Sequence, residues 1–528
     1  MTELAASATR DIHRLALEGL ADRMQDSLLA SALSPVAREG MDCAAALFLP
    51  DGRVLAQAHS LPLLLGGMIP GIAGLLRAFP AATLAEGDGL LMNDPWSGGT
   101  HLPDFIVARP VLVDGCVVAI AATILHHQDV GGIAPGSVPP DARDIFQEGL
   151  RLPPLRAWRG GEADPGIAAI LAANSRAPAM LTGDLAAQWA SVTLAARELA
   201  ALARRMGLAG FATANQALID EARAGLAAGL ALLPEAQAQA DEALEGDGRS
   251  AALVPIRVTL RVHGGRLAVD FTGSAPQTEG PVNAAPSGML AACFLLLRRI
   301  APDAPANHGL LELLDLTLPE GSVVNPRFPA ALNARTATVK LACNAMLVAL
   351  ARLSPLPAAA SNSGVAVVLS VGGRDDTGRD WLFTEIIAGG AGGSPEGPGL
   401  PAISVDVSNA RNLPAEMLER TAPVRVEEIA VRAHSGGPGL HRGGDGTRRI
   451  YRLLSGSAEI SYRGERHLSG AAGAQGGGAG MAAAARIVGP QGVRHLPSKA
   501  RVAWAAGERL IIETSGGGGW GSVTGETT

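Results

Sequence analysis

The chain has 528 residues and a formal net charge of −7 at pH 7, from 43 Lys and Arg against 50 Asp and Glu. This mild acidity without a basic run argues against a nucleic-acid partner. The sequence contains no run of 18 apolar residues, so it does not predict a membrane span. The length suits roughly two to four domains. The cysteines lie far apart in apolar surroundings, which predicts buried free thiols in a reducing cytosol, and no signal-peptide pattern opens the chain, so we expect a cytoplasmic protein. They are Cys43, Cys116, Cys293 and Cys343.

The N-terminal region is predicted to start with a helix and a hairpin. Apolar residues recur at spacings of three and four over residues 9–32, which indicates one buried helical face. Two apolar runs within residues 44–57 flank a Pro-Asp-Gly turn and indicate a β-hairpin. Asp42 precedes the first of these strands, at a position where a carboxylate usually orders a turn.

A second predicted hairpin follows. Residues 105–113 and 116–125 are apolar runs on either side of Asp114-Gly115, a strong two-residue turn signal. If residues 113 and 116 pair, the antiparallel register places Pro103 opposite His126 and Asp104 opposite Leu125. The hairpin therefore carries two segments that are distant in the sequence to the same place.

Two histidines and an aspartate at that end of the hairpin form a candidate metal site. Imidazole nitrogen with carboxylate oxygen suits Zn, Mn or Fe, and an open position would let a bound water ionise near neutral pH. The register does not choose between His126 and His127, because His101 and His126 share one face while Asp104 and His127 share the other. Pro103 cannot donate a ladder hydrogen bond, so the strand should start after it, which leaves Asp104 free to turn. The alternative is that these polar residues order two loops.

The remaining chain alternates between helical and strand periodicity. Residues 184–206 predict a packing helix with Asp184 as its N-cap, and an Ala-rich helical region covers residues 212–244. Near residue 250 the period changes from 3.6 to 2, which predicts a hairpin. Further helices are expected over 287–301 and 337–353, and strand-like runs separated by Gly turns follow from residue 424.

Together these elements predict an α+β fold. An N-terminal mixed α/β region with the metal-bearing hairpin (1–183) precedes a helical segment (184–249), a mixed α/β domain (250–423) and a mainly antiparallel C-terminal β module (424–528). The Gly-rich stretches of that module lack a Walker motif and do not clearly precede helices, so they are interpreted as tight turns. The alternative is that His434 or Arg442 contacts a phosphorylated intermediate.

Several blocks of the sequence resemble the hydantoinase B family, in order and over almost the whole chain. That family contains the B subunits of N-methylhydantoinase and ATP-dependent lactamases, half of 5-oxoprolinase, and a subunit of acetone and acetophenone carboxylases. The blocks are NDPWSGGTHLPD, HHQDVGGIAPGSVPP, IFQEGLRLPP, NSRAPAMLTGDLAAQ, DFTGSAPQTEGPVNA, LPEGSVVNP, HSGGPGLHRGGDG and TSGGGGWG.

The resemblance implies particular roles for particular residues. It implies a divalent metal on His101, Asp104 and His126. Asp42 either reaches the metal or, like His127, accepts a proton from its water. The substrate contacts that we expect are Glu148, Asn409 and Asn412, although Glu148 could equally form a surface ion pair and the two asparagines could instead order their loop. Leu64 departs from the family, which often has a His in that block, and nearby His59 is interpreted as a solvated loop residue.

The function implied by the resemblance is divided between two chains. A hydantoinase A-type ATPase subunit phosphorylates a hydantoin, 5-oxoproline or lactam, and this B-type chain hydrolyses the activated cyclic amide with a metal-bound water. The expected assembly is a hetero-oligomer, with ATP bound on the partner. The alternatives are a subunit of an ATP-dependent ketone carboxylase, and a scaffold subunit with a degenerate site.

Overall fold

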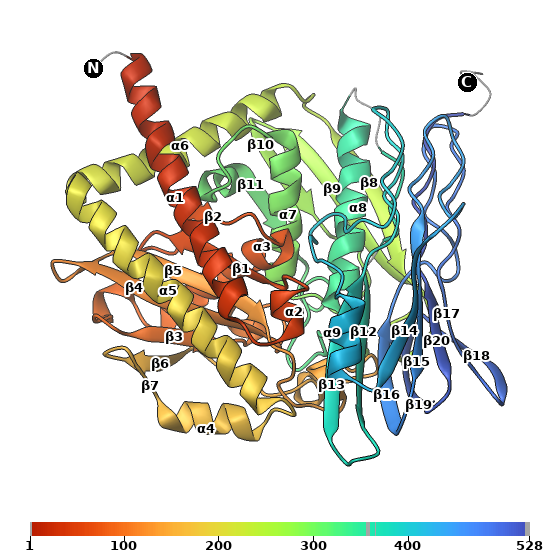
Figure 1. The fold of residues 1–528 in the computed structure, drawn as a ribbon. Coiled ribbons are helices and arrows are strands. Elements are labelled where there is room, and N and C mark those ends of the chain that lie inside the picture. The colour runs from red at the N-terminus through yellow and green to blue at the C-terminus, as the bar shows by residue number, and fades with distance from the viewer. Residues whose placement is uncertain (1–2, 355–358, 365, 523–528) are drawn as a thin grey trace.

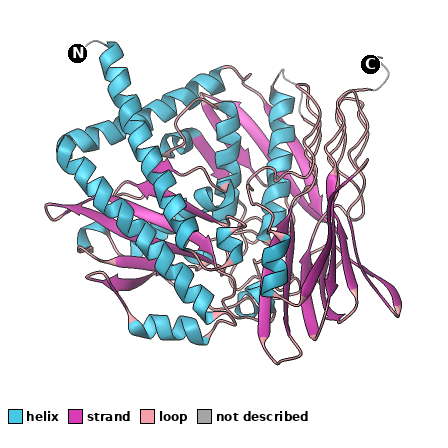
Figure 2. Ribbon diagram, viewed as in Figure 1, coloured by secondary structure: helices cyan, strands magenta, loops and turns pink. Residues whose placement is uncertain are grey.

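The computed structural model describes residues 3–354, 359–364 and 366–522. A helix-rich body with a seven-stranded sheet forms one side of the molecule, and a strand-rich module forms the other (Figure 1; Figure 2). The fold is α+β, as predicted, and its sheets are largely antiparallel. The four segments expected from the sequence remain a proposal about folding units.

The seven-stranded sheet is antiparallel throughout, and its central strands are buried on both faces. In β1 the sequence CAAALF is buried at every position, because an unbroken apolar run suits a strand covered on both sides. The strands, in spatial order, are β2 (Val54–Gln57), β1 (Cys43–Phe48), β5 (Cys116–His126), β4 (Asp104–Val113), β3 (Gly89–Met92), β6 (Leu155–Arg159) and β7 (Glu162–Ala163).

Helices cover this sheet in two layers. Helices α1 (Glu3–Ser31) and α5 (Pro178–Met206) pack on the face that carries Ala45 and Leu47. On the face that carries Ala44 and Ala46, α3 (Pro62–Ala78) packs against the sheet and against α7 (Pro286–Ile300). The remaining helices of the described chain are α2 (Pro35–Arg38), α4 (Pro165–Ala173), α6 (Leu208–Ala231), α8 (Arg335–Leu353) and α9 (Ala415–Thr421).

A second sheet shares the core of the helical body. Its strand β9 alternates buried and exposed side chains along its length, which is the pattern of a sheet with one solvated face. By length and apolar composition, α8 is the one described helix that could cross a membrane, but 67% of that window is buried inside the protein, as in a core helix. The strands, in spatial order, are β11 (Leu314–Thr317), β10 (Arg266–Asp270), β9 (Val254–His263) and β8 (Gln237–Leu244).

Two further sheets pack face to face in the C-terminal module around one apolar core that includes Tyr462, Trp504, Tyr451 and Leu510. In spatial order, one contains β13 (Asp380–Ile387), β12 (Val367–Arg374), β16 (Ser457–Arg463) and β19 (Lys499–Ala505). The other contains β14 (Val424–Arg432), β15 (Gly446–Leu453), β20 (Arg509–Glu513), β17 (Ala484–Gly489) and β18 (Gly492–Leu496).

The Gly-rich stretches of this module run side by side and bond through their backbones. Gly437 N donates to Gly517 O at 2.8 Å, and Gly519 N donates to Gly478 O at 2.9 Å. A Cβ on Gly517 would lie 1.9 Å from the carbonyl oxygen of Ala391, so glycine is required for this close approach of chains. The glycines therefore serve backbone packing.

Three sequence predictions are wrong in detail. Residues 237–244 form β8 rather than helix, because α6 ends before Pro234 and pairing with β9 overrides helix propensity. Asp184 is not an N-cap, because α5 already begins at Pro178; its buried Oδ1 accepts from Leu33 N at 2.6 Å instead. Cys116 is an exposed free thiol, because it directly follows the turn of its hairpin.

Candidate metal centre

The β4–β5 hairpin has the predicted turn but not the predicted register. Val113 pairs with Cys116 as expected, but a bulge near Val111 shifts the ladder by one residue. Asp104 therefore lies opposite His126, so both side chains leave the same face of the sheet. The prediction that Asp104 shares a face with His127 is wrong because a bulge reverses the alternation of faces beyond it. Strand β4 begins at Asp104, directly after the proline, as predicted.

The structure brings His101, Asp104 and His126 together. His101 Nε2 lies 3.0 Å from Asp104 Oδ1 and 3.0 Å from His126 Nδ1, and His126 Nδ1 lies 3.1 Å from the same Asp104 oxygen. If each imidazole donates its proton to Asp104 Oδ1, the short contact between His101 Nε2 and His126 Nδ1 contains no hydrogen bond. A cation bound by all three atoms would account for that short contact.

The spacing of the three atoms tests whether a metal ion fits. Ligands about 2.1 Å from a metal are about 3.0 Å apart at right angles and about 3.4 Å apart in a tetrahedron. The observed separations of 3.0–3.1 Å are close enough for the three atoms to bind one ion. The donor set is two imidazoles and one carboxylate, and it fits a divalent metal ion.

The electrostatics of the centre favour the protonation states that a metal ligand needs. Burial, with the positive charge of Arg335, lowers the pKa of His101 to about 3, so the imidazole is neutral at pH 7. Burial alone would raise the pKa of Asp104, but interactions with His101 and Arg335 hold it well below its usual value. A neutral imidazole beside an ionised carboxylate can bind a metal without first releasing a proton.

The two predicted proton acceptors lie in different places. Asp42 Oδ2 is 3.9 Å from His126 Nδ1, and the Asp42 carbonyl accepts from His126 N at 3.0 Å. His127 packs on the ring of Phe105 with the centroids 4.3 Å apart, and its Nε2 lies 3.0 Å from Gln188 Oε1. Asp42 is therefore at the centre, whereas the structure does not bring His127 to it.

Glu148 is buried and holds a loop at the start of α8. Its Oε1 accepts from Leu332 N at 2.7 Å, Asn333 N at 2.9 Å and Asn333 Nδ2 at 2.9 Å. Its Oε2 is buried with no hydrogen-bond partner among the described residues. Burial raises the pKa of the Glu148 carboxyl to about 7, against the opposing effect of these hydrogen bonds. The surface ion pair with Arg151 that the sequence allowed does not form, because the Glu148 side chain turns inward while Arg151 lies 3.9 Å from Asp94.

This burial predicts a pH-dependent stability. Between the ordinary pKa of 4.5 and the folded value of about 7, the folded protein keeps a proton that the unfolded chain releases. Stability should therefore fall as pH rises through this window, by about 3 kcal/mol in total. Glu148→Gln keeps an oxygen for the three donors and cannot ionise, so its free energy of unfolding should lack this fall when measured from pH 5 to 8. An equal fall in the variant would contradict the assignment.

The other residues singled out from the sequence lie on the surface or in the apolar core. Asn409 is exposed, and Asn412 is exposed with its Oδ1 accepting from Arg449 Nη2 at 2.6 Å. Leu64 is buried in the apolar core beside the sheet. His59 is 89% exposed and pairs with Asp22 at 3.1 Å, as expected of a solvated loop residue.

Two residues at the centre were missed from the sequence. Asp104 Oδ2 accepts from Thr100 Oγ1 at 2.5 Å and from Arg335 Nη2 at 2.5 Å. Thr100 lies in the same block as His101 and could have been suspected from that position. Arg335 lies at the start of α8, 231 residues beyond Asp104, where no local pattern marks it.

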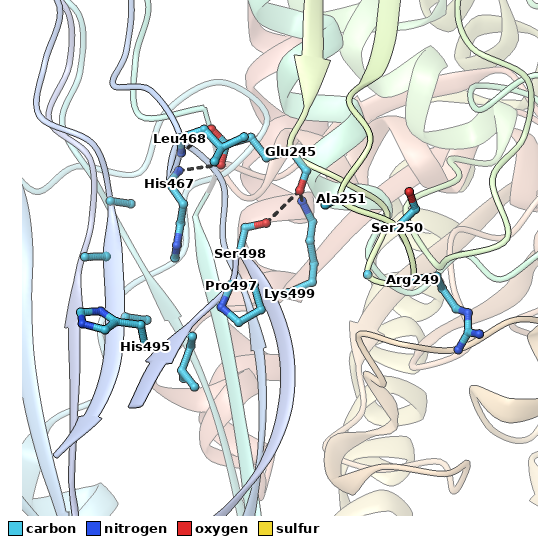
Figure 3. Close-up of a pocket in the computed structure, with 15 residues that line it drawn as sticks. Glu245, Arg249, Ser250, Ala251, His467, Leu468, His495, Pro497, Ser498 and Lys499 are labelled. Carbon is cyan, nitrogen blue, oxygen red and sulfur yellow. Dashed lines mark hydrogen bonds between the residues drawn. The ribbon is translucent and has the colours of Figure 1, made fainter. Parts of the chain in front are cut away.

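A separate cavity of about 520 Å³ lies between the loop after β8 and the C-terminal module (Figure 3). In its wall the Glu245 carboxylate accepts from His467 N at 2.6 Å and Leu468 N at 2.9 Å, and the Ser498 hydroxyl donates to the Glu245 carbonyl at 2.9 Å (Figure 3). The residues that line this cavity do not include the three candidate ligands. We therefore assign the chemistry from the donor geometry of the hairpin rather than from the size of a cavity.

The fold and the centre define an α+β protein with a candidate site for a divalent metal. The family model described as Hydantoinase B/oxoprolinase matches residues 7–523, and the chain belongs to that family. The putative D-/L-hydantoinase B subunit of Pseudomonas sp. (strain NS671) is 30% identical over 469 residues, which cover 85% of this chain and 79% of that protein.

Two solved structures share the fold. The ATP-dependent caprolactamase from Pseudomonas jessenii is similar with a TM-score of 0.90 and 27% sequence identity, over 98% of this chain and 91% of that chain. The nucleotide-free acetone carboxylase is similar with a TM-score of 0.88 and 16% identity, over 97% of this chain and 75% of that chain. At that identity, the second comparison bears on the fold alone.

Proposed function

We propose that this protein is the B-type component of an ATP-dependent amidohydrolase that opens a cyclic amide such as a hydantoin, 5-oxoproline or a lactam. The observation that carries the proposal is the convergence of His101, Asp104 and His126 within 3.1 Å of one another. Family membership and the similarity to a caprolactamase support the substrate class.

The chain's own residues suit this reaction. A divalent ion at the triad would supply a Lewis acid that polarises a carbonyl and makes water more acidic. Two imidazoles and one carboxylate suit Zn, Mn or Fe. Asp42 Oδ2 lies 3.9 Å from His126 Nδ1, one of the three proposed ligand atoms, so Asp42 is near enough to accept a proton from a water at the centre. Burial of the centre would exclude bulk water. Glu148, Asn409 and Asn412 remain proposed substrate contacts.

The activation step belongs, in this proposal, to a separate chain. We propose a hydantoinase A-type ATPase as the partner in a hetero-oligomer, with ATP bound there. Two similar proteins, whose names make them the B subunit of a hydantoinase and the beta subunit of a caprolactamase, support the partner. A cytoplasmic location is part of the same proposal, and the four free cysteines of the described chain suit a reducing compartment.

Two other functions are tested by the same experiment. The second candidate is a ketone carboxylase subunit, which the resemblance of the sequence blocks includes and with which the shared fold of acetone carboxylase is compatible. The third candidate is a scaffold subunit. Leu64, where the family often has a histidine, is the reason for considering it.

The decisive experiment is to purify the chain with an A-type partner and to screen ATP hydrolysis against hydantoins, 5-oxoproline, lactams and acetone. We expect ADP release that depends on one cyclic amide and matches ring opening in amount. ATP turnover that requires acetone and bicarbonate would favour the carboxylase instead. A folded complex without bound metal and without turnover would favour the scaffold.

A further inference from the structure

We infer that Arg335, together with Thr100, is a positioning residue that makes Asp104 a one-oxygen ligand. The inference rests on the proposed metal centre and assigns a role to two residues that are not themselves metal donors. Arg335 is 2% exposed, and its guanidinium reaches Asp104 from the start of α8, an element remote from the hairpin in the sequence.

The two oxygens of Asp104 have separate neighbours. Oδ1 lies 3.0 Å and 3.1 Å from the two imidazole nitrogens. Oδ2 accepts one bond from the Thr100 hydroxyl and one from Arg335, each 2.5 Å long. A carboxylate oxygen that already accepts two strong donors is a poor ligand for a cation, so only Oδ1 remains available.

The position of Arg335 is fixed by the chain around it. Glu148 holds the backbone of Leu332 and Asn333, which lie just before Arg335 in the chain. Arg463 donates to the carbonyl and to the side-chain oxygen of Asn333 from the C-terminal module. Three elements that are distant in the sequence therefore converge to place one guanidinium at Asp104 Oδ2.

This arrangement has a chemical consequence. A carboxylate that binds an ion through one oxygen occupies one coordination position, whereas chelation through both oxygens would occupy two. One-oxygen binding by Asp104 would therefore leave one more position open to water or substrate. Metal affinity alone does not report this role, because the guanidinium also repels a cation, so its removal has two opposing effects on affinity.

The test is the visible spectrum of the protein loaded with Co²⁺, which reports coordination number and geometry. Arg335→Met and Thr100→Val should each change the band positions and intensities relative to the unsubstituted protein, because each removes one of the two donors that hold Asp104 Oδ2. With the partner present, kcat should fall about 10- to 100-fold, the usual cost of losing a residue that orients a ligand, and KM should change less. Arg335→Lys should recover part of the spectrum, and Thr100→Ser, which keeps the hydroxyl, should recover most of it.

Arg466→Met is the matched control, because it removes another largely buried guanidinium, which pairs with Glu242 at 3.0 Å away from Asp104. Its Co²⁺ spectrum should be unchanged. Spectra of Arg335→Met and Thr100→Val that match the unsubstituted protein would overturn the inference, as would a spectral change of equal size in Arg466→Met. A rise in KM with an unchanged spectrum would show that Arg335 meets the substrate, and would also overturn it. Failure of the unsubstituted protein to bind Co²⁺ would refute the proposed function itself.

Discussion

Replacing His101 by alanine is expected to abolish metal binding at micromolar concentrations while the chain stays folded. If three ligands share a binding free energy of about 12 kcal/mol, the loss of one costs about 4 kcal/mol, or about 10³-fold in Kd. The fold should tolerate the change, because the other nitrogen of His101, Nδ1, has no hydrogen-bond partner among the described residues. The measurements are metal content after dialysis and the free energy of unfolding of the metal-free proteins.

His59→Ala is the control, because His59 is an exposed histidine on a loop, where its ring pairs with Asp22 rather than with any residue of the metal centre. It should keep the full metal content. Normal metal content in His101→Ala would count against the site, and loss of metal in both variants would mean that the ion binds surface histidines. ATP-dependent ring opening should be lost in His101→Ala alone.

The sequence predicts the composition of the site better than its geometry. The Asp114-Gly115 turn predicts that the segments carrying His101, Asp104 and the His126-His127 pair meet, and the family resemblance selects His126 from that pair. The faces of their side chains cannot be deduced, because one bulge near Val111 reverses the alternation and periodicity does not reveal a single inserted residue. Because of the bulge, the side chains of Asp104 and His126 lie on the same face of the sheet. In the register without a bulge, the Asp104 side chain would have had to turn to reach His126.

Contacts between distant segments are the part that the sequence does not reveal. Arg335 meets Asp104 only because α8 is packed against the second sheet and its first turn is held by Glu148 and Arg463. Nothing local to residue 335 distinguishes it from any other arginine at a helix start. Glu148 shows the same limit, because nothing in its sequence block reveals its burial or its three hydrogen bonds, which depend on residues 332–333.

Some of the helices and strands can also be predicted from the sequence, and others cannot. Strand β9 and helix α7 are predictable because their apolar residues follow one clear period. Residues 237–244 are not, because the sequence QAQADEAL suits a helix locally and becomes a strand only through eight paired positions with β9. Tertiary pairing decides the structure of such segments.

Replacing Asp42 by asparagine is expected to lower kcat of the complex about 10²- to 10⁴-fold, which is the usual contribution of a positioned general base. Metal content should stay near one ion per chain, because Asp42 is not one of the three proposed ligands and its Oδ2 lies 3.9 Å from His126 Nδ1, too far for a hydrogen bond. The change is nearly isosteric and keeps the backbone bond from His126 N to the carbonyl of residue 42. Initial rates and metal content of the purified complex measure both effects.

Comparing His127→Gln with Asp42→Asn shows which of the two residues predicted from the sequence accepts the proton. His127 lies against Phe105 and Gln188, on the side of the sheet away from Asp104, so its replacement should lower stability and leave kcat within about threefold. Equal losses of kcat in both variants would mean that proton transfer passes through the second histidine after all. A large loss in His127→Gln with a near-normal rate in Asp42→Asn would reverse the assignment, because a nearby carboxylate that does not move protons cannot be the base.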